Sequence, residues 1–305
     1  MTAMSEIAVT PESRPLGKSG ITTSPIAWGM WRFGNSSVED GRALIDAALA
    51  AGVTLFDTAD IYGFDGSSGF GDAEALLGRV FAEAPALRGQ MVLATKGGIT
   101  PPVPYDQSRD YLMQALDASL ARLGTEQVDL YQVHRPDILT HPEELARTLQ
   151  AMIASGKVRA VGVSNFSVSH TRALAAFLDV PLASIQPEFS PLALDPIEGG
   201  LLDLAMEMDL AVLAWSPLGG GRIGAPEDER SRRVAAVLDR EATAAGVSRA
   251  AVAYSWIMAH PARPIPIVGT QNVQRIGEIA QVYAVRWTRQ SWYDVLVASR
   301  GERLP

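Results

Sequence analysis

The feature that most constrains the fold is a regular alternation of short apolar runs with helical segments. Eight runs have the length and composition of buried β-strands, and successive runs start about 25 to 55 residues apart. Strand–helix alternation indicates a parallel sheet covered by helices, and eight repeats close a (β/α)8 barrel. The sequence therefore predicts an α/β protein whose residues 1–305 form one TIM-barrel domain. The predicted strands are Ile26–Trp28, Thr54–Asp57, Met91–Lys96, Leu130–His134, Arg159–Ser164, Ile185–Glu188, Val212–Trp215 and Ile265–Val268.

The segments between these runs place their apolar residues at helical spacing on one face. The predicted helices are Val38–Ala51, Ser108–Leu123, Glu143–Ser155, Ser167–Phe177, Leu201–Met208, Arg230–Ala245, Arg249–Ala259 and Val273–Ala280. Outside the repeats, Arg14–Phe33 with its turn at Gly17–Gly20 is expected to form a small hairpin before the barrel. Residues 1–13 are expected to be a flexible tail. The segment after about Trp287 is expected to be a C-terminal tail over the barrel mouth.

Charge and cysteine content exclude several classes of function. The formal net charge is −8 and the pI about 5.1, which argues against a nucleic-acid or membrane-surface partner. The chain has no cysteine, so disulfides, thiolate nucleophiles and thiolate metal sites are excluded. This composition, with no signal peptide or membrane-spanning run, predicts a cytoplasmic protein. No metal site is expected.

Chemically capable side chains stand at the ends of three neighbouring predicted strands. Asp57 ends the second strand, Lys96 the third and His134 the fourth, and Tyr62 follows Asp57 by five residues. Lysine is rare here, with only three in the chain, so one at the end of an apolar strand is hard to explain by packing. In a TIM barrel the catalytic groups lie at these strand ends. The barrel therefore predicts that the four side chains meet at its mouth.

These four groups suit proton transfer to a carbonyl oxygen. A free tyrosine has a pKa near 10, and a nearby ammonium group lowers the pKa of the phenol. Asp57 would hold Lys96 charged, and His134 would donate a hydrogen bond to a substrate oxygen. The set contains no hydride, so a nicotinamide cofactor is implied. Each residue alone also suits a structural role: Asp57 as a strand cap, Tyr62 as a half-buried aromatic and His134 as a core histidine. These separate roles do not explain why the residues occur together at neighbouring strand ends.

The motifs Asp57-x4-Tyr62, Lys96-Gly97-Gly98 and Val133–Asp137 resemble those of the aldo-keto reductase superfamily. The resemblance extends from about Leu16 to Ala280. It implies that Tyr62 is the general acid, that Lys96 and Asp57 tune it, and that hydride passes from nicotinamide C4 to the carbonyl carbon. Two further runs, Gln186–Leu192 and Trp215–Arg222, resemble a bacterial subgroup of largely uncharacterised oxidoreductases.

Polar and aromatic residues near other strand ends suggest the cofactor site. Ser164, Asn165 and Gln186 carry groups suited to a carboxamide, and the resemblance assigns them to the nicotinamide, with Trp215 stacking on its ring. Thr270 and Arg275 are candidates for an adenosine 2′-phosphate, which favours NADPH, with NADH as the alternative. Gly219-x-Gly221-x-x-Gly224 matches a dinucleotide fingerprint in the wrong context, so we expect a loop there. The other predicted cofactor contacts are Gly29, Met30, Trp31, Asp57, Ser216, Pro217, Leu218, Gly220, Gly269, Gln271 and Glu278.

The predicted substrate pocket is aromatic and partly open. Its expected walls are Trp31, Phe64, Tyr105 and Arg135, although Arg135 also suits a structural pair with Asp137. Such a mouth fits small aldehydes or ketones. The sequence thus predicts an NADPH-dependent carbonyl reductase that is a monomer or a weak homo-oligomer. Two alternatives stay open: a Schiff-base aldolase with Lys96 as nucleophile, and a non-catalytic nicotinamide-binding regulatory subunit.

Overall fold

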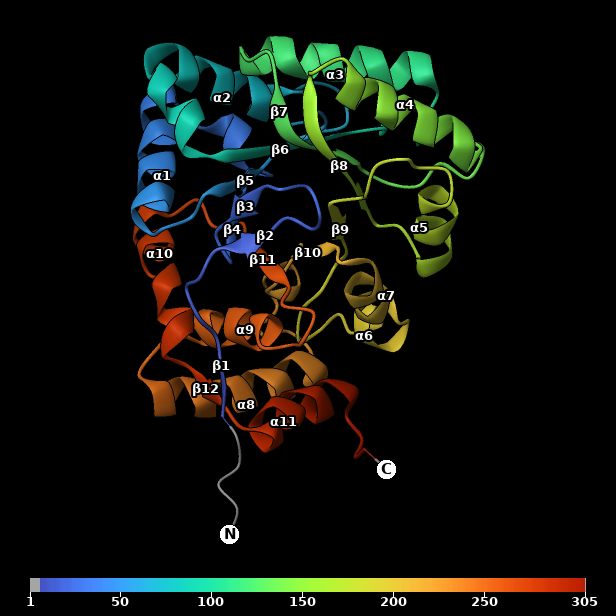
Figure 1. Ribbon diagram of the computed structural model, residues 1–305. Coiled ribbons are helices and arrows are strands. Elements are labelled where there is room, and N and C mark those ends of the chain that lie inside the picture. Colours follow the sequence, from blue (N-terminus) through green and yellow to red (C-terminus); the bar gives the residue numbers. More distant parts are fainter. Residues whose placement is uncertain (1–5, 305) are drawn as a thin grey trace.

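The computed structural model describes residues 6–304 and contains a closed parallel barrel (Figure 1). Its strands follow the order β10-β11-β4-β5-β6-β7-β8-β9. Each of the eight predicted strands is present, with ends within two residues of those expected, so the barrel prediction is confirmed. The strands are β4 (Ala27–Gly29), β5 (Leu55–Asp57), β6 (Val92–Gly97), β7 (Val128–Val133), β8 (Val158–Ser164), β9 (Ser184–Gln186), β10 (Ala211–Ala214) and β11 (Ile265–Val268).

All eight predicted helices also form and lie outside the barrel (Figure 1). Ser37 and Ser167 cap two of them through their side chains, as N-cap residues do. The last predicted helix is shorter than expected, because it ends at Gly277 and a 3₁₀ segment, η4 (Ile279–Ala284), follows. The helices are α1 (Val38–Ala50), α3 (Arg109–Leu123), α4 (Pro142–Ala154), α5 (Val168–Ala175), α7 (Leu201–Met208), α8 (Glu229–Ala245), α9 (Arg249–Met258) and α10 (Val273–Gly277).

Further helical elements were not expected from the sequence. They are α2 (Asp72–Glu83), α6 (Asp195–Glu198) and α11 (Arg289–Arg300), with the 3₁₀ segments η1 (Phe33–Asn35), η2 (Pro85–Gln90) and η3 (Gly219–Gly221). Helix α2 begins after Gly71, which has a φ of 89°. Because glycine has no side chain, this helix lacks a side-chain cap. It is held instead by a buried apolar face that includes Leu76, Leu77 and Phe81.

The two ends of the chain pack on the outside of the barrel. Strand β1 (Ile7–Ala8) pairs antiparallel with β12 (Arg286–Trp287), and Val9 is buried. The prediction of a flexible tail is therefore wrong for these residues, while positions 1–5 lie outside the described part. Helix α11 packs along α8, and its Trp292 ring stacks on Trp256 of α9 at 4.8 Å. The prediction that this segment covers the mouth is also wrong, because its buried tryptophan binds it to the outer helices.

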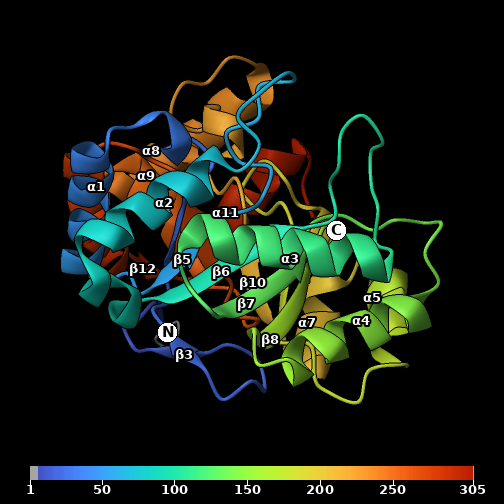
Figure 2. The same cartoon turned by 90° about the horizontal axis from the view of Figure 1, so that it is seen from above.

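The predicted hairpin before the barrel is present but shorter than the expected range Arg14–Phe33, because only β2 (Arg14–Pro15) and β3 (Thr22–Thr23) pair. It closes the N-terminal end of the barrel, and Figure 2 shows it on one side of the molecule. Its Leu16 and Ile21 join the core inside the barrel. At Gly17, with φ of 55°, a Cβ atom would lie 2.5 Å from the carbonyl oxygen of Ala183, so only glycine fits. We call this hairpin, residues 14–23, the hairpin plug. Because it closes the N-terminal end, the C-terminal ends of the strands form the open mouth.

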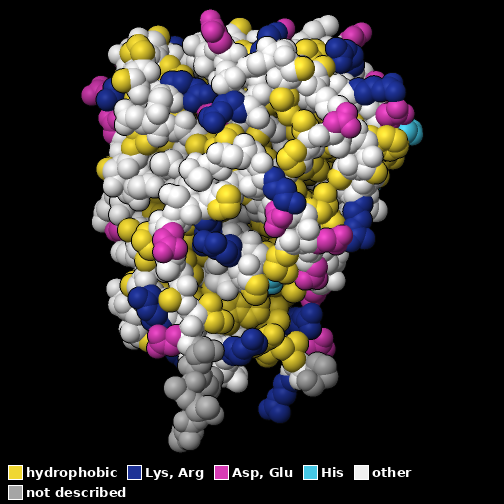
Figure 3. Space-filling view, in the orientation of Figure 1, with side chains coloured by type: hydrophobic (Ala, Val, Ile, Leu, Met, Phe, Trp, Pro, Cys, Tyr) yellow, Lys and Arg dark blue, Asp and Glu magenta, His cyan; other side chains and the backbone are white. Residues whose placement is uncertain are grey.

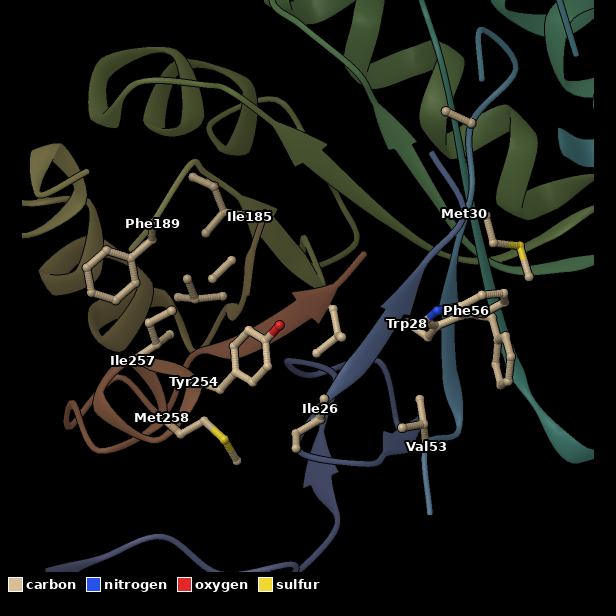
Figure 4. Close-up of a cluster of buried hydrophobic side chains, with 14 of the residues drawn as sticks. Ile26, Trp28, Met30, Val53, Phe56, Ile185, Phe189, Tyr254, Ile257 and Met258 are labelled. Atoms are coloured by element: carbon tan, nitrogen blue, oxygen red, sulfur yellow. The ribbon is translucent and has the colours of Figure 1, made fainter. Parts of the chain in front are cut away.

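Alternation along the strands separates two apolar cores and directs the polar side chains inward. Ala27 and Leu55 face the inside, whereas Trp28 and Phe56 face the helices, where their rings meet edge to face at 5.8 Å (Figure 4). By the same alternation, Asp57 lies on the inner face above Leu55. Charged side chains of both signs are interspersed over the face in Figure 3. No helix within residues 6–304 has the length and apolarity needed to cross a membrane.

Candidate active site

The Lys96 ammonium group is the centre of the site at the barrel mouth. It is fully buried, and its Nζ donates to Asp57 Oδ2 at 2.6 Å, to the Thr58 carbonyl at 2.9 Å and to the Tyr62 hydroxyl at 3.1 Å. The turn after β5 fixes Tyr62, since its carbonyl accepts from Ala73 at the start of α2. An ammonium group has three protons, and these three oxygens account for all of them. The structure thus joins three of the four predicted catalytic side chains.

Two glutamines hold the other oxygen of Asp57. Gln132 Nε2 on β7 donates to Asp57 Oδ1 at 3.3 Å, and Gln186 Nε2 on β9 donates at 3.0 Å. Sequence reasoning missed Gln132, although a glutamine within the apolar run Val128–Val133 is an informative signal. Gln186 was predicted as a nicotinamide contact, but its amide nitrogen is engaged by Asp57 here. These bonds orient the carboxylate toward Lys96.

Burial and neighbouring charge shift the pKa values of Tyr62 and Lys96 in opposite directions. Burial raises the pKa of the Tyr62 phenol above its usual value, and the Lys96 ammonium offsets only part of this rise. Burial by itself would lower the pKa of Lys96, but Asp57 and Tyr62 raise it above the usual value. Lys96 is therefore charged and Tyr62 is a neutral phenol at physiological pH. The expected effect of the ammonium on Tyr62 is present, but burial outweighs it.

His134 lies beside Tyr62, with ring centroids 5.9 Å apart. Burial lowers the pKa of this histidine well below its usual value, and the positive charges of Lys96 and Arg135 act in the same direction. The imidazole is therefore neutral and carries one N–H donor. Its Nδ1 is buried and has no hydrogen-bond partner among the described residues. A neutral imidazole next to a phenol is suited to donate a hydrogen bond to a carbonyl oxygen.

Asn165 links Ser164 and Trp215, two other predicted cofactor contacts, beside this group. Asn165 has a φ of 60°, and its Nδ2 donates to the His134 carbonyl and to Ser164 Oγ, both at 3.0 Å. Trp215 Nε1 donates to Asn165 Oδ1 at 3.0 Å. The half-buried Trp215 side chain thus adjoins a cluster of amide and hydroxyl groups. This donor and acceptor set fits a carboxamide next to a flat ring.

The loop after β10 contains the predicted contacts Ser216, Pro217, Leu218 and Gly220. Ser216 Oγ accepts from the Gly220 amide at 2.8 Å. Gly220 and Gly221 have φ of 68° and 97°, and a Cβ atom at either position would have no other atom within 4 Å. The literal glycine fingerprint thus lies in η3 and its loop, not in a Rossmann unit. Open glycine backbone of this kind can approach a phosphate group closely.

The residues after β11 lie at the same end of the barrel. The Thr270 carbonyl accepts from Trp28 Nε1 at 2.9 Å, and Asn272 caps α10 through Arg275 N. Gln271 Oε1 is buried without a hydrogen-bond partner among the described residues. Gly269, Gly29, Arg275 and Glu278 adjoin this segment, while the Met30 side chain is fully buried in the outer core. An unpartnered acceptor among these groups is consistent with a ligand there.

Aromatic side chains surround the entrance. Trp31 is 66% exposed, and its ring meets Tyr62 edge to face at 5.4 Å. Phe64 contacts Phe70 at 6.2 Å, and Tyr105 is exposed. The alternative pairing of Arg135 is not present, because Asp137 accepts instead from Leu139 N and Thr140 Oγ1. Within residues 6–304 no group of three or more acidic or histidine side chains is arranged to hold a metal ion.

Comparisons with known proteins show which family the chain belongs to. The model of the Aldo/keto reductase family matches residues 25–296. The chain is 59% identical over 304 residues to a 6-dehydroglucose reductase of Novosphingobium aromaticivorans, covering 99% of this chain and all of that protein. A second 6-dehydroglucose reductase, from Agrobacterium fabrum, is 38% identical over 293 residues, covering 92% and 96%. A glycerol dehydrogenase structure from Gluconobacter oxydans has a TM-score of 0.82 at 26% identity, covering 97% and 98%. The chain therefore belongs to the aldo/keto reductase family of oxidoreductases, which act on C=O and CH–OH groups.

Proposed function

We propose that the chain is an NADPH-dependent reductase of aldehydes and ketones, and that 6-dehydroglucose is its substrate. The observation that carries the proposal is the Lys96 ammonium group, which joins the Asp57 carboxylate to the hydroxyl of a neutral Tyr62. The substrate rests on the relative that shares 59% of its residues with this chain. In 6-dehydroglucose a carbonyl replaces the C6 alcohol of glucose, so its reduction gives glucose.

The residues of this chain have distinct tasks in the proposed reaction. A bound nicotinamide supplies the hydride that the carbonyl carbon accepts. Tyr62 Oη donates its proton to the carbonyl oxygen, and His134 donates a hydrogen bond to the same oxygen. Lys96 stabilises the phenolate left on Tyr62, because the two groups are 3.1 Å apart. Hydride and proton together convert the carbonyl into an alcohol.

The proposed cofactor contacts follow the geometry at the mouth. Ser164 and Asn165 would hold the carboxamide and Trp215 would lie against the ring, since Asn165 hydrogen-bonds to both of the other side chains. The open glycine loop after β10 would accept the pyrophosphate, and Thr270 with Arg275 would accept the 2′-phosphate. The preference for NADPH over NADH rests on Arg275, an exposed cation in α10 whose guanidinium group would pair with the 2′-phosphate. Cytoplasmic location and a monomeric or weakly associating state remain predictions.

The two alternatives from the sequence are less well supported. A Schiff-base aldolase needs an accessible, neutral lysine amine. Lys96 is fully buried, its three protons are engaged and its pKa is raised, so it is a poor nucleophile. A regulatory subunit would bind the cofactor without turning it over, and the assay below tests that possibility.

The test follows NADPH oxidation at 340 nm with 6-dehydroglucose and with 4-nitrobenzaldehyde, and then repeats it with NADH. Tyr62→Phe removes the proton donor, so kcat should fall by several powers of ten while NADPH affinity, read from tryptophan fluorescence, stays nearly unchanged. Asn165→Ala should instead weaken NADPH binding. Wild-type turnover in Tyr62→Phe would show that the acid is another group. Cofactor binding without turnover of either aldehyde would favour the regulatory subunit.

A further inference from the structure

Polar side chains follow one another on the inner face of β9, from the barrel interior to the mouth. Ser184 Oγ donates to Gln132 Oε1 inside the barrel at 3.3 Å, and Gln186 Nε2 donates to Asp57 Oδ1 at 3.0 Å. Side chains two residues apart in a strand lie on the same face. The pairing continues beyond the end of β9, because Glu188 forms a parallel bridge with Trp215 and the Phe189 amide donates to the Trp215 carbonyl. Glu188 is therefore the next inward side chain, above Gln186.

Glu188 is half-buried, and it has no described partner. Within residues 6–304 its carboxylate accepts no hydrogen bond and lies in no ion pair. Burial raises the pKa of this carboxyl and Asp195 adds to the rise, whereas Arg222 and Arg135 lower it. The Glu188 oxygens are not among the buried unpartnered atoms of the described residues, so they are open to solvent and free to accept from a ligand hydroxyl.

Arg135 follows His134 directly in the chain, and its positive charge lowers the pKa of both His134 and Glu188. Its guanidinium group is half-buried and forms no hydrogen bond or ion pair with the described residues. Among residues 6–304, the segments that follow β7 and β9 thus carry a donor, Arg135, and an acceptor, Glu188, whose side chains have no protein partner.

We infer that Glu188 determines specificity for polyhydroxylated aldehydes by accepting hydrogen bonds from substrate hydroxyl groups while the carbonyl lies between Tyr62 and His134. This inference rests on the proposed reductase function and extends it from carbonyls in general to sugars. A carboxylate has two oxygens and accepts from two neighbouring hydroxyls at once. Arg135 donates to the hydroxyl oxygens beside them, and the exposed Trp31 ring offers an apolar face on the same mouth.

The experiment compares aldehydes that differ in their hydroxyl groups. D-glyceraldehyde and propanal both have three carbons, but only glyceraldehyde has hydroxyls, and 6-dehydroglucose and 4-nitrobenzaldehyde form a second pair. We would measure kcat/KM with NADPH for the wild type, Glu188→Gln, Glu188→Asp and the control Glu227→Gln. Glu227 is an exposed carboxylate in the loop after β10, so its substitution removes the same charge at the same end of the barrel. A thermal melt of each variant checks folding.

The expected result is a loss of selectivity rather than of catalysis. Glu188→Gln should lower kcat/KM for glyceraldehyde and 6-dehydroglucose about tenfold or more, since each lost charge-assisted hydrogen bond has roughly that effect. Propanal and 4-nitrobenzaldehyde should be reduced at wild-type rates, Glu188→Asp should recover part of the loss, and Glu227→Gln should behave as the wild type.

Three outcomes would overturn the inference in distinguishable ways. Equal losses for the hydroxylated and the plain aldehydes would show that Glu188 supports the site rather than selects substrates. No loss for any aldehyde would show that it contacts no hydroxyl, and in both cases the proposed reductase function would stand. A wild type that reduces none of the four aldehydes would overturn the proposed function and this inference together.

Discussion

At the scale of residues, the defining feature is one fully buried cation whose three protons each contact an oxygen. Lys96 depends on Asp57, and Asp57 is in turn held by Gln132 and Gln186. The sequence predicted Lys96 and Asp57 as site residues because both end a predicted strand, and the catalytic groups of a TIM barrel lie at the C-terminal strand ends. It did not predict Gln132 or the second role of Gln186. Those bonds depend on which side chains face each other across the barrel, which local sequence does not determine.

The Lys96–Asp57 ion pair makes a stability prediction. Asp57→Asn leaves the ammonium group buried without its counter-ion, so the free energy of unfolding should fall by about 3–5 kcal/mol. The matched control is Asp46→Asn, which breaks the exposed pair with Arg42 and should cost less than about 1 kcal/mol. Urea unfolding followed by circular dichroism measures both. Equal losses for the two variants would contradict the assigned charge of Lys96.

His134 makes a prediction about pH. Its folded-state pKa is lowered, mainly by burial, so below about pH 6.5 the unfolded chain takes up a proton that the native protein does not. The free energy of unfolding should therefore fall as the pH drops from about 6.5, by up to about 1.4 kcal/mol per pH unit from this group. The free energy of unfolding can be measured by urea titration at several pH values below about 6.5 and plotted against pH. The slope should be smaller for His134→Gln, whereas the exposed His170→Gln should keep the wild-type slope.

At the scale of elements, prediction succeeded where the pattern is local and failed where the partner is distant. The eight strands are continuous apolar runs, and most helices carry a capping serine or a clear apolar stripe. Helix α2 was missed because it has a glycine at its N-cap and another, Gly78, in its interior. Strands β1 and β12 have two residues each and exist only because opposite ends of the chain meet. No local pattern identifies such short strands.

Gly78 gives a test of element packing. A Cβ atom at this position would lie 2.0 Å from the Arg122 carbonyl oxygen at the end of α3. Gly78→Ala should therefore destabilise the protein by about 1–3 kcal/mol, although alanine is the better helix former. The control is Gly277→Ala in α10, where nothing lies within 4 Å, and it should be neutral or stabilising. Thermal melts compare the two, and a stabilised Gly78→Ala would show that α2 and α3 are not in close contact.

At the scale of the whole molecule, the barrel places the reacting groups at one end and a packed hairpin, the hairpin plug, at the other. At the closed end Arg14 is buried and donates to the carbonyls of Arg263 and Pro264. Its pKa is lowered to about 10, first by burial and then by Arg263. The sequence predicted that the reacting groups lie at the C-terminal strand ends, because parallel strands place all these ends on one side. It did not predict that the hairpin closes the other end.

Arg14→Met tests whether a change at the closed end leaves the mouth unaffected. It removes the hydrogen bonds to two buried carbonyls, so the free energy of unfolding should fall by about 1–3 kcal/mol, while kcat/KM for 4-nitrobenzaldehyde stays at the wild-type value. Trp31→Ala at the mouth should lower kcat/KM and leave the free energy of unfolding near the wild-type value, since this side chain is 66% exposed and touches Tyr62. Parallel changes of activity and stability in both variants would show that the two ends are coupled.

The scarcity of lysine has a practical consequence for coupling the protein to a surface. Of the three lysines, Lys96 is fully buried, whereas the Lys18 and Lys157 side chains are 57% and 38% exposed. Lys18 lies in the hairpin plug, and Lys157 directly precedes β8, so both belong to the closed end of the barrel. Amine-reactive supports that bind lysine side chains would therefore attach this end. On an electrode or bead, molecules coupled through a lysine side chain would be attached by the closed end, with the mouth toward the solution.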